Sequence, residues 1–275
     1  MNRQQVPIFM YHEVVEANGF DAIAGRIQTD YVVSTETFEA HLRRLHELGC
    51  SSIDLGALIG WLRDGTPIPP RSVVITFDDG FAGNATLATP LLEKYGFTAT
   101  FFIATNRIGD AAMLSWEQLR DMAARGMAIE SHTASHPLLS TLSAEETRRE
   151  FIHSREALES GLGTSVNYIS LPNGDSNPWY ASLACQCGYH GGCGSEFGVN
   201  DREVDPYFLR RIAIKRNTTV RDIGDYVLRD TLSYNWAMSK ARVKRMVPRL
   251  IGKQRYDRLY NTFFGVAEQR KGRAE

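Results

Sequence analysis

The chain has no long hydrophobic run, few cysteines and almost no net charge. No stretch of its 275 residues approaches the roughly 20 apolar residues of a membrane-spanning helix, and the N-terminus has no apolar segment of signal-peptide length. The sequence as given therefore predicts a cytoplasmic protein. Four cysteines are too few for a disulfide framework in a chain this long. A net charge of −1 provides no chain-wide electrostatic surface for nucleic acid, so we expect no nucleic-acid partner.

Three of the four cysteines lie beside His190 in the segment CQCGYHGGC, residues 185–193. One interpretation is a zinc site made of thiolates and an imidazole. The spacing matches none of the usual pairs of zinc ligands, however. The segment is more typical of a helix that ends at Gly188 and is followed by a strand of small residues. We therefore favour a structural role for these cysteines.

Short apolar runs alternate with amphipathic segments about seven times along most of the chain. The segments between the runs begin with helix-capping residues, as in the Ser-x-x-Gln of residues 115–118. Strands that are apolar on both faces are typical of parallel sheets covered by helices. The pattern therefore predicts one α/β domain, either a barrel or a doubly wound sheet. The clearest runs are SVVITF (72–77), TATFFIA (98–104), MAIES (127–131), YISLP (168–172) and FLRRIAI (208–214).

The last forty or so residues have a different composition. Between Trp236 and Glu275 there are eleven Lys or Arg residues against three acidic ones, with apolar and aromatic residues between them. We therefore divide the chain into an α/β domain, residues 1–232, and a basic, partly amphipathic helical extension, residues 233–275. Such an extension can bind an anionic membrane, which would place the protein at the inner membrane face. It can equally be a solvated helical appendage.

Carboxylates and imidazoles follow two of the expected strands, where active sites of parallel α/β proteins form. Asp78 and Asp79 end one strand, and burial of either carboxylate without a partner would be costly. His132 and His136 follow another strand, and on a helical turn this spacing lets two imidazoles reach one ion. One carboxylate and two histidines leave coordination positions open, as catalytic zinc-like sites do. The structural alternatives are a turn at the aspartates and two histidines at the rim.

The segments TFDDG (76–80) and SHTASHP (131–137) together resemble the polysaccharide deacetylase family, the nodulation-type deacetylase domain of carbohydrate esterase family 4. The resemblance covers roughly residues 6–215, and it is most similar to the exopolysaccharide and poly-N-acetylglucosamine deacetylase branch. It implies a distorted (β/α) barrel of about seven strands. It also implies metal-dependent removal of acetyl groups from an N-acetylated carbohydrate, with a metal-bound water as nucleophile.

Carried over by position, the resemblance assigns Asp78 as the general base. The metal ligands would be Asp79, His132 and His136. The expected cofactor is a divalent ion, with Zn²⁺ favoured and Co²⁺ or Ni²⁺ as alternatives.

The third motif of the family departs from its usual form. The family has Arg-x-Pro-Tyr-Gly, whose arginine braces the catalytic aspartate, whereas this chain has SLPNG with Ser170 at the arginine position. Because serine carries no charge, we expect Asp78 to be held less firmly and its pKa to be depressed less. Asn173, after Pro172, stands where the family uses a backbone N–H to bind the oxyanion.

The late motif that carries the family's general acid is also missing, because His190 is the last histidine of the chain. The leaving amine must still be protonated. His12 is the best candidate, since it ends the first expected strand, and relatives similar to the poly-N-acetylglucosamine deacetylases carry a histidine there. The alternative is a structural histidine at the rim.

Five further residues are candidates for a sugar site, although each is equally plausible as core or rim packing: Tyr11, Phe81, Asn84, Trp116 and Trp179. Two other functions stay open. The first is removal of formyl or another small acyl group from a lipid-linked or soluble sugar. The second is a non-catalytic protein that binds glycan or lipid, as the two missing motif residues would allow.

Overall fold

A computed structural model describes residues 4–20, 29–229, 234, 235 and 239 of the chain. Its strands are β1 (Val6–Tyr11), β2 (Glu13–Val15), β3 (Val32–Ser34), β4 (Ser51–Ser52), β5 (Ser72–Phe77), β6 (Thr100–Ile103), β7 (Ala128–Ser131), β8 (Tyr168–Ser170), β9 (Gly191–Phe197), β10 (Val199–Asn200) and β11 (Leu209–Ala213). Its α-helices are α2 (Thr35–Glu47), α3 (Leu55–Asp64), α4 (Thr89–Lys94), α5 (Trp116–Ala124), α6 (Ala144–Leu162), α7 (Tyr180–Gln186) and α8 (Val220–Leu228). Short turns of other helix types are η1 (Thr29–Tyr31), η2 (Asn84–Ala88), η3 (Thr105–Arg107), η4 (Leu139–Thr141) and η5 (Pro172–Gly174).

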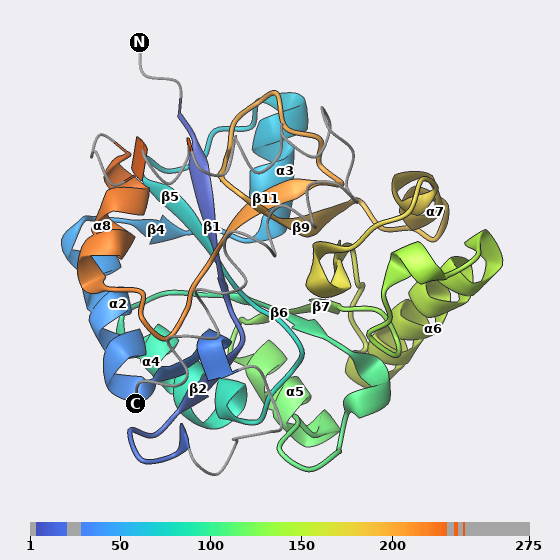
Figure 1. Ribbon diagram of the computed structural model, residues 1–275, viewed down its shortest axis with the longest axis horizontal. Coiled ribbons are helices and arrows are strands. Elements are labelled where there is room, and N and C mark those ends of the chain that lie inside the picture. The colour runs from blue at the N-terminus through green and yellow to red at the C-terminus, as the bar shows by residue number, and fades with distance from the viewer. Residues whose placement is uncertain (1–3, 21–28, 230–233, 236–238, 240–275) are drawn as a thin grey trace, which may run out of the picture. The chain divides into compact units, whose positions relative to one another are not determined.

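Seven parallel strands close into a barrel in the order β1, β5, β6, β7, β8, β9 and β11. Closure depends on β1, which pairs with β5 on one side and with β11 on the other. Figure 1 shows α2, α4, α5 and α6 around the strands. Strands β4 and β10 extend the sheet, and β2 and β3 form a separate pair. The (β/α) barrel that the alternating pattern and the resemblance predict is confirmed.

The helices begin where the capping residues predict. At the start of α2, the side chain of Ser34 accepts a hydrogen bond from the backbone N–H of Thr37. Ser115 and Ser143 each form a complete capping box, at the starts of α5 and α6. Helix α7 differs, because it begins at Tyr180 without a side-chain capping hydrogen bond.

An aromatic cluster fills the barrel wall beneath α2. Phe77 stacks on Phe101 at 4.7 Å between ring centroids and on Tyr11 at 5.4 Å, and Phe38 of α2 meets both Tyr11 and Phe77 edge-on. Tyr11 is 1% exposed, and its hydroxyl is hydrogen-bonded to Nδ1 of His41 at 3.2 Å. Its placement in a sugar site is therefore wrong, because its side chain faces the helix layer.

Residues 1–228 form one compact unit, and residues 229–275 form a second. The predicted boundary between residues 232 and 233, and nearly all of the basic extension, lie outside the described residues, so both stay predictions. In the part of the chain that the structure describes, no helix is both long and apolar enough to cross a membrane.

Candidate active site

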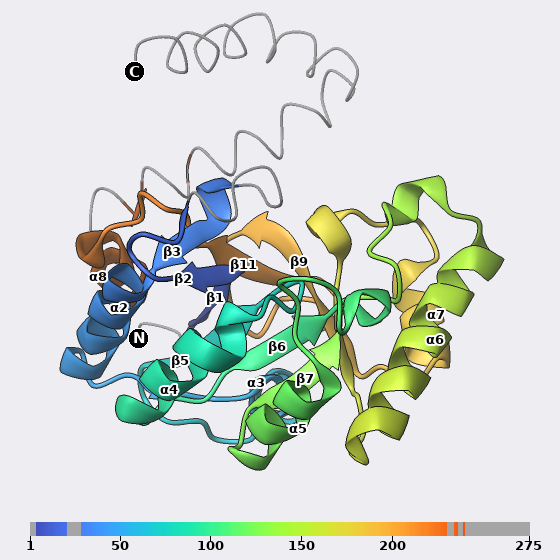
Figure 2. The ribbon, with the colours of Figure 1, turned by 90° about the horizontal axis from the view of Figure 1, so that it is seen from below.

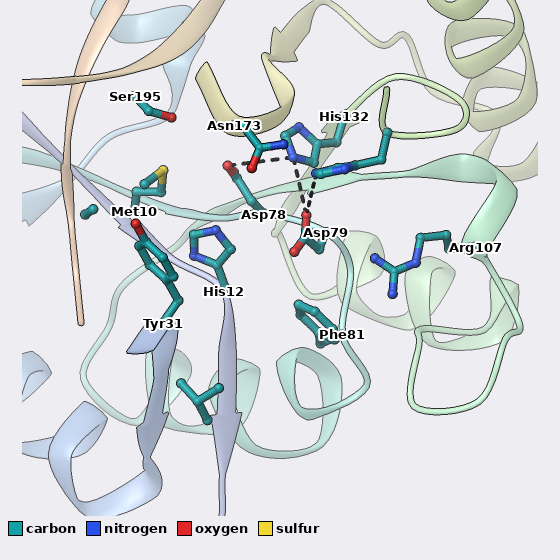
Figure 3. Close-up of a pocket in the computed structure, with 13 residues that line it drawn as sticks. Met10, His12, Tyr31, Asp78, Asp79, Phe81, Arg107, His132, Asn173 and Ser195 are labelled. Carbon is teal, nitrogen blue, oxygen red and sulfur yellow. Dashed lines mark ion pairs between the residues drawn. The ribbon is translucent and has the colours of Figure 1, made fainter. Parts of the chain in front are cut away.

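A pocket of about 310 Å³ opens where the barrel strands end. Many of its lining residues lie in segments that follow β1, β5, β6, β7 and β8, and Figure 3 shows their side chains. Figure 2 shows helices α4, α5 and α6 beside the strands of the barrel. The carboxyl ends of parallel strands gather at one end of a barrel, so residues distant in sequence meet there. The lining residues are Met10, His12, Tyr31, Val32, Asp78, Asp79, Phe81, Arg107, His132, His136, Asn173, Ser195 and Ala213.

One carboxylate and two imidazoles converge in this pocket. Oδ1 of Asp79 lies 3.4 Å from Nε2 of His132 and 3.2 Å from Nε2 of His136. One ligand atom from each of the three residues lies within 4.8 Å of the others. Among the described residues, no other group of three His, Cys, Asp or Glu side chains is this close. The structure thus brings together the three residues predicted as metal ligands, and it gives no support to a site at the cysteines.

The backbone, rather than a helical turn, brings the two histidines together. The segment from His132 to His136 is not helical, so that part of the prediction is wrong. Thr133 and His136 have φ angles of 65° and 59°, and Asp79 has a φ angle of 75°. Left-handed conformations are unfavourable for residues with a Cβ atom and are common at binding sites. Two of the three clustered residues therefore hold such a conformation.

A hydrogen bond orients His132 toward the cluster. Its Nδ1 lies 2.8 Å from the backbone oxygen of Ser170, an acceptor, so Nδ1 carries the proton and Nε2 presents its lone pair. Burial lowers the pKa of His132, but the charges of Asp78 and Asp79 outweigh burial and raise it. The three side chains thus form a site that attracts a cation, and their donor types suit a divalent transition metal.

Asp78 is held by a buried arginine that the sequence analysis missed. Nη1 of Arg211 donates to Oδ1 of Asp78 and Nη2 donates to Oδ2, each at 2.7 Å. The same Nη2 donates to the Ser170 hydroxyl at 2.8 Å, and that hydroxyl donates to Oδ2 of Asp78. The expectation of a loosely held Asp78 is therefore wrong. Arg211 comes from β11, and the small Ser170 side chain leaves room for its guanidinium.

The electrostatics of Asp78 follow from this pair. Burial alone would raise the pKa of Asp78, but the charges of Arg211 and His132 outweigh it and hold the pKa below its ordinary value. One signal in the sequence pointed to Arg211: it lies within the apolar strand FLRRIAI, and a buried arginine requires an anionic partner. The sequence alone does not say which carboxylate pairs with Arg211.

His12 lies at the end of β1 and lines the pocket, across Asp78 and Asp79 from His132 in the view of Figure 3. Its ring packs against Tyr31 at 4.8 Å between centroids, and its backbone oxygen accepts a hydrogen bond from Asn84. Within the described ranges, its buried Nδ1 has no hydrogen-bond partner. Burial lowers the pKa of His12, although Asp78 and Asp79 oppose this effect. The imidazole is thus placed beside both carboxylates with a nitrogen free to react.

Comparison with known proteins agrees with this geometry. The sequence model of the polysaccharide deacetylase family matches residues 65–192. YxkH of Bacillus subtilis, which carries the name of this family, is 30% identical over 223 residues, which cover 81% of this chain and 76% of YxkH. The chain belongs to the polysaccharide deacetylase family.

Other members extend the comparison. A poly-β-1,6-N-acetyl-D-glucosamine N-deacetylase of Staphylococcus aureus is 26% identical over 227 residues, which cover 74% of this chain and 77% of that enzyme. The fold matches Streptococcus pyogenes deacetylase PplD, solved in complex with acetate, with a TM-score of 0.76 over 82% of this chain and 99% of PplD at 24% identity. It matches IcaB from Ammonifex degensii with a TM-score of 0.69 over 81% of this chain and 97% of IcaB at 21% identity.

The third motif of this family member lies in η5. Asn173 lines the pocket with a φ angle of 55°, and Pro172 before it is buried. Trp179 is 38% exposed and does not line the pocket. The structure therefore places Asn173 at the pocket, whereas Pro172 and Trp179 are not among the residues that line it.

The remaining sugar-site candidates divide between pocket and packing. Phe81 lines the pocket, whereas Asn84 is buried and bonded to His12. Trp116 packs so closely on Gly161 of α6 that a Cβ at that glycine would overlap its ring. Sequence reasoning missed three further pocket residues: Tyr31 in η1, Arg107 in η3 and Ser195 in β9. Only closure of the barrel brings these separate elements to one pocket.

Proposed function

We propose that this chain is a metal-dependent hydrolase that removes N-acetyl groups from an amino sugar of a glycan or glycan intermediate. The observation that carries the proposal is the convergence of Asp79, His132 and His136 beside a second carboxylate, Asp78, which Arg211 holds in place. Membership in the polysaccharide deacetylase family supports this class of reaction. The Asp78–Arg211 pair also argues against a non-catalytic relative, because the charge missing from the third motif is supplied from β11.

Asp79, His132 and His136 would hold the divalent ion. Two imidazoles and one carboxylate suit Zn²⁺, with Co²⁺ or Ni²⁺ as alternatives. When bound, such an ion supplies Lewis-acid polarisation of the acetyl carbonyl and lowers the pKa of water. Burial alone would raise the pKa of Asp79, but the neighbouring imidazoles of His132 and His136 outweigh burial and hold the pKa below its ordinary value, which keeps this ligand ionised.

Asp78 would accept the proton of the attacking water. Each of its oxygens accepts one hydrogen bond from Arg211, and a carboxylate has about four acceptor sites, so acceptor capacity remains for water. Because both oxygens are anchored, the carboxylate cannot rotate away from the pocket. Arg211 is therefore a positioning residue that acts through Asp78.

Two further groups complete the chemistry. The backbone N–H of Asn173 would donate to the oxyanion, a role that the side chain does not affect. His12 would protonate the leaving nitrogen, since expulsion of an unprotonated amide anion is prohibitive. Burial lowers the pKa of His12, which makes the protonated imidazole a stronger acid and reduces its protonated fraction near neutral pH.

The substrate that the relatives support is an acetylated glucosamine polymer, because one is named for poly-β-1,6-N-acetyl-D-glucosamine. Contact with an anionic membrane through residues 233–275 is a separate prediction, and nearly all of that segment lies outside the described residues.

The test joins metal analysis to an assay of acetate release from N-acetylglucosamine oligomers. We expect one divalent ion per chain in the wild type and its loss in His136→Ala. Asp78→Asn and His12→Gln should keep the ion and lose about 10²- to 10⁴-fold in kcat, the usual contribution of a general base or acid. Full activity of His12→Gln would refute its role.

A parallel assay on formamido sugars separates the two acyl groups. If the protein hydrolyses formamido sugars and not acetamido sugars, the proposed function changes from deacetylase to deformylase. A wild-type protein that stays inert on both sugars with added zinc, cobalt or nickel would overturn the enzyme proposal.

A further inference from the structure

A cation that the proposed chemistry does not use lies in the active-site pocket. Arg107 ends η3, just after β6, and its guanidinium faces the pocket beside Asp79 and Phe81 in Figure 3. The guanidinium carbon lies 5.7 Å from the centroid of the Phe81 ring. No described residue forms an ion pair or a side-chain hydrogen bond with Arg107. Its charge is thus presented to whatever occupies the pocket.

Other half-buried arginines of the domain have partners. Arg125 donates to Glu93 and Asp121, and Arg155 donates to Glu159 and to two backbone oxygens. The face of one aromatic ring satisfies none of the five N–H groups of a guanidinium. A ligand with acceptor atoms in the pocket would therefore meet donors on Arg107 that no described residue uses.

The charges around Arg107 favour an anionic ligand. Asp78 is already neutralised by Arg211, and Asp79 would be neutralised by the divalent ion. The carboxylates of the pocket therefore have no charge left to balance Arg107. A guanidinium binds carboxylates and phosphates through two parallel hydrogen bonds, which makes these the groups that Arg107 suits best.

The backbone ties Arg107 to the metal-ligand loop. The N–H groups of Thr105 and Asn106 donate to the backbone oxygens of Thr133 and Ala134, between the two histidines, at 3.3 and 2.8 Å. The backbone that carries Arg107 is thus tied to the loop that carries His132 and His136. A pocket of about 310 Å³ is at the small end for ligand sites, so a group that reaches Arg107 belongs to the reacting sugar or its direct neighbour.

We propose that Arg107 is a specificity-determining residue that binds an anionic group, a carboxylate or a phosphate, on the sugar undergoing deacetylation or on the unit bonded to it. This inference rests on the proposed deacetylase function and narrows its substrate class to acidic or phosphorylated N-acetyl glycans.

The test compares three matched substrates: a neutral N-acetylglucosamine disaccharide, N-acetylmuramic acid as the carboxylate, and a phosphate ester of N-acetylglucosamine. The variants are Arg107→Gln, Arg107→Lys and, as a control, Arg149→Gln, since Arg149 is exposed on α6. We expect the wild type to prefer one anionic substrate. Arg107→Gln should reduce kcat/KM for that substrate about 10- to 100-fold, mainly through KM, as loss of hydrogen bonds to a charged group does. The loss of kcat/KM for the neutral substrate should be clearly smaller than this, because that substrate offers the guanidinium no charge.

Arg107→Lys should recover part of the loss, because charge is kept and the paired geometry is not. A second readout is calorimetric binding of the same phosphate ester to metal-loaded protein in a His12→Gln background, which keeps the ion and suppresses turnover; adding Arg107→Gln should weaken this binding at least tenfold and adding Arg149→Gln should leave it intact. Metal content should be equal in all three variants. Which anionic substrate responds tells carboxylate from phosphate.

Equal loss on neutral and anionic substrates would overturn the proposal, because Arg107 would then only support the pocket. A wild type that prefers the neutral disaccharide would overturn it as well. Absence of turnover on every acetamido sugar would instead refute the proposed function. Arg107-dependent binding of the phosphate ester would still hold in that case and would support the anion site alone.

Discussion

Replacement of Arg211 by methionine tests the central contact of the site. Methionine has a similar length and no charge, so the variant removes the two 2.7 Å hydrogen bonds to Asp78 and leaves the volume nearly filled. Both side chains are buried, at 0% and 4% exposure. Asp78 then becomes a buried carboxylate whose remaining neutral partner is the Ser170 hydroxyl.

The magnitude follows from the burial of the pair. Removal of one partner of a buried ion pair costs about 3–5 kcal/mol. For a domain of this size, each kcal/mol lowers Tm by about 2–4 °C, so we expect a decrease of roughly 6–20 °C. In the wild type, the pKa of Asp78 is lower in the folded than in the unfolded state. Asp78 therefore stabilises the fold above the unfolded carboxyl pKa of about 3.9, and this stabilisation is lost as pH falls through the pKa of the folded state.

In Arg211→Met, the contribution of Asp78 to the free energy of unfolding should change with pH in the opposite direction. With Arg211 gone, burial raises the pKa of Asp78, so the carboxyl takes up a proton more readily. The stability difference between wild type and variant should be largest near neutral pH and shrink as pH falls. The acid limb of the kcat/KM profile should move to higher pH, because the proton acceptor is lost earlier.

The assay is urea unfolding followed by tryptophan fluorescence at several pH values, with acetate release in parallel. Arg210→Met is a matched control, because Arg210 is the neighbouring residue, lies partly exposed and faces Glu196 at 3.6 Å. It should change stability by less than about 0.5 kcal/mol. The double variant Asp78→Asn with Arg211→Met should be more stable than Arg211→Met alone, since the unpaired charge of Asp78 is removed. Wild-type stability and an unmoved acid limb in Arg211→Met would refute the reasoning.

Two further predictions concern the stability of the barrel. Burial lowers the pKa of His41 to about 4. The free energy of unfolding should therefore fall by up to about 3 kcal/mol as pH falls from 6.5 toward 4, because the buried imidazole must take up a proton. In urea unfolding, His41→Gln should reduce this dependence of stability on pH, whereas His46→Gln, at an exposed position, should not. An unchanged slope in His41→Gln would contradict the assignment. Gly83→Ala places a Cβ against a backbone oxygen of β2 and should lower the free energy of unfolding by about 1–3 kcal/mol. Gly194→Ala should be tolerated, because the nearest atoms to a Cβ there lie at 3.9 Å. Equal Tm values of the two variants would contradict this packing argument.

The sequence was sufficient for features that depend on neighbours along the chain. The apolar runs and capping residues predicted the strands and most helices, because burial on both faces and capping hydrogen bonds are local requirements. The placement of Asp79, His132 and His136 at strand ends followed from the same pattern. The prediction of a helical turn between the histidines failed, because residues 133 and 136 adopt left-handed conformations that their side chains do not favour.

Contacts across the barrel were beyond the sequence. Tyr11 and His12 are adjacent, and alternation along a strand does not say which of the two faces the pocket; the position of α2 decides that Tyr11 is core.

By itself, then, the sequence determined the (β/α) fold class and the side chains that can bind a metal ion. The tertiary structure alone decided that Arg211, 133 residues after Asp78, replaces the arginine missing at Ser170, and that Arg107 faces the same pocket. The physical reason is closure: when β1 pairs with both β5 and β11, it brings strand ends together that no local pattern relates.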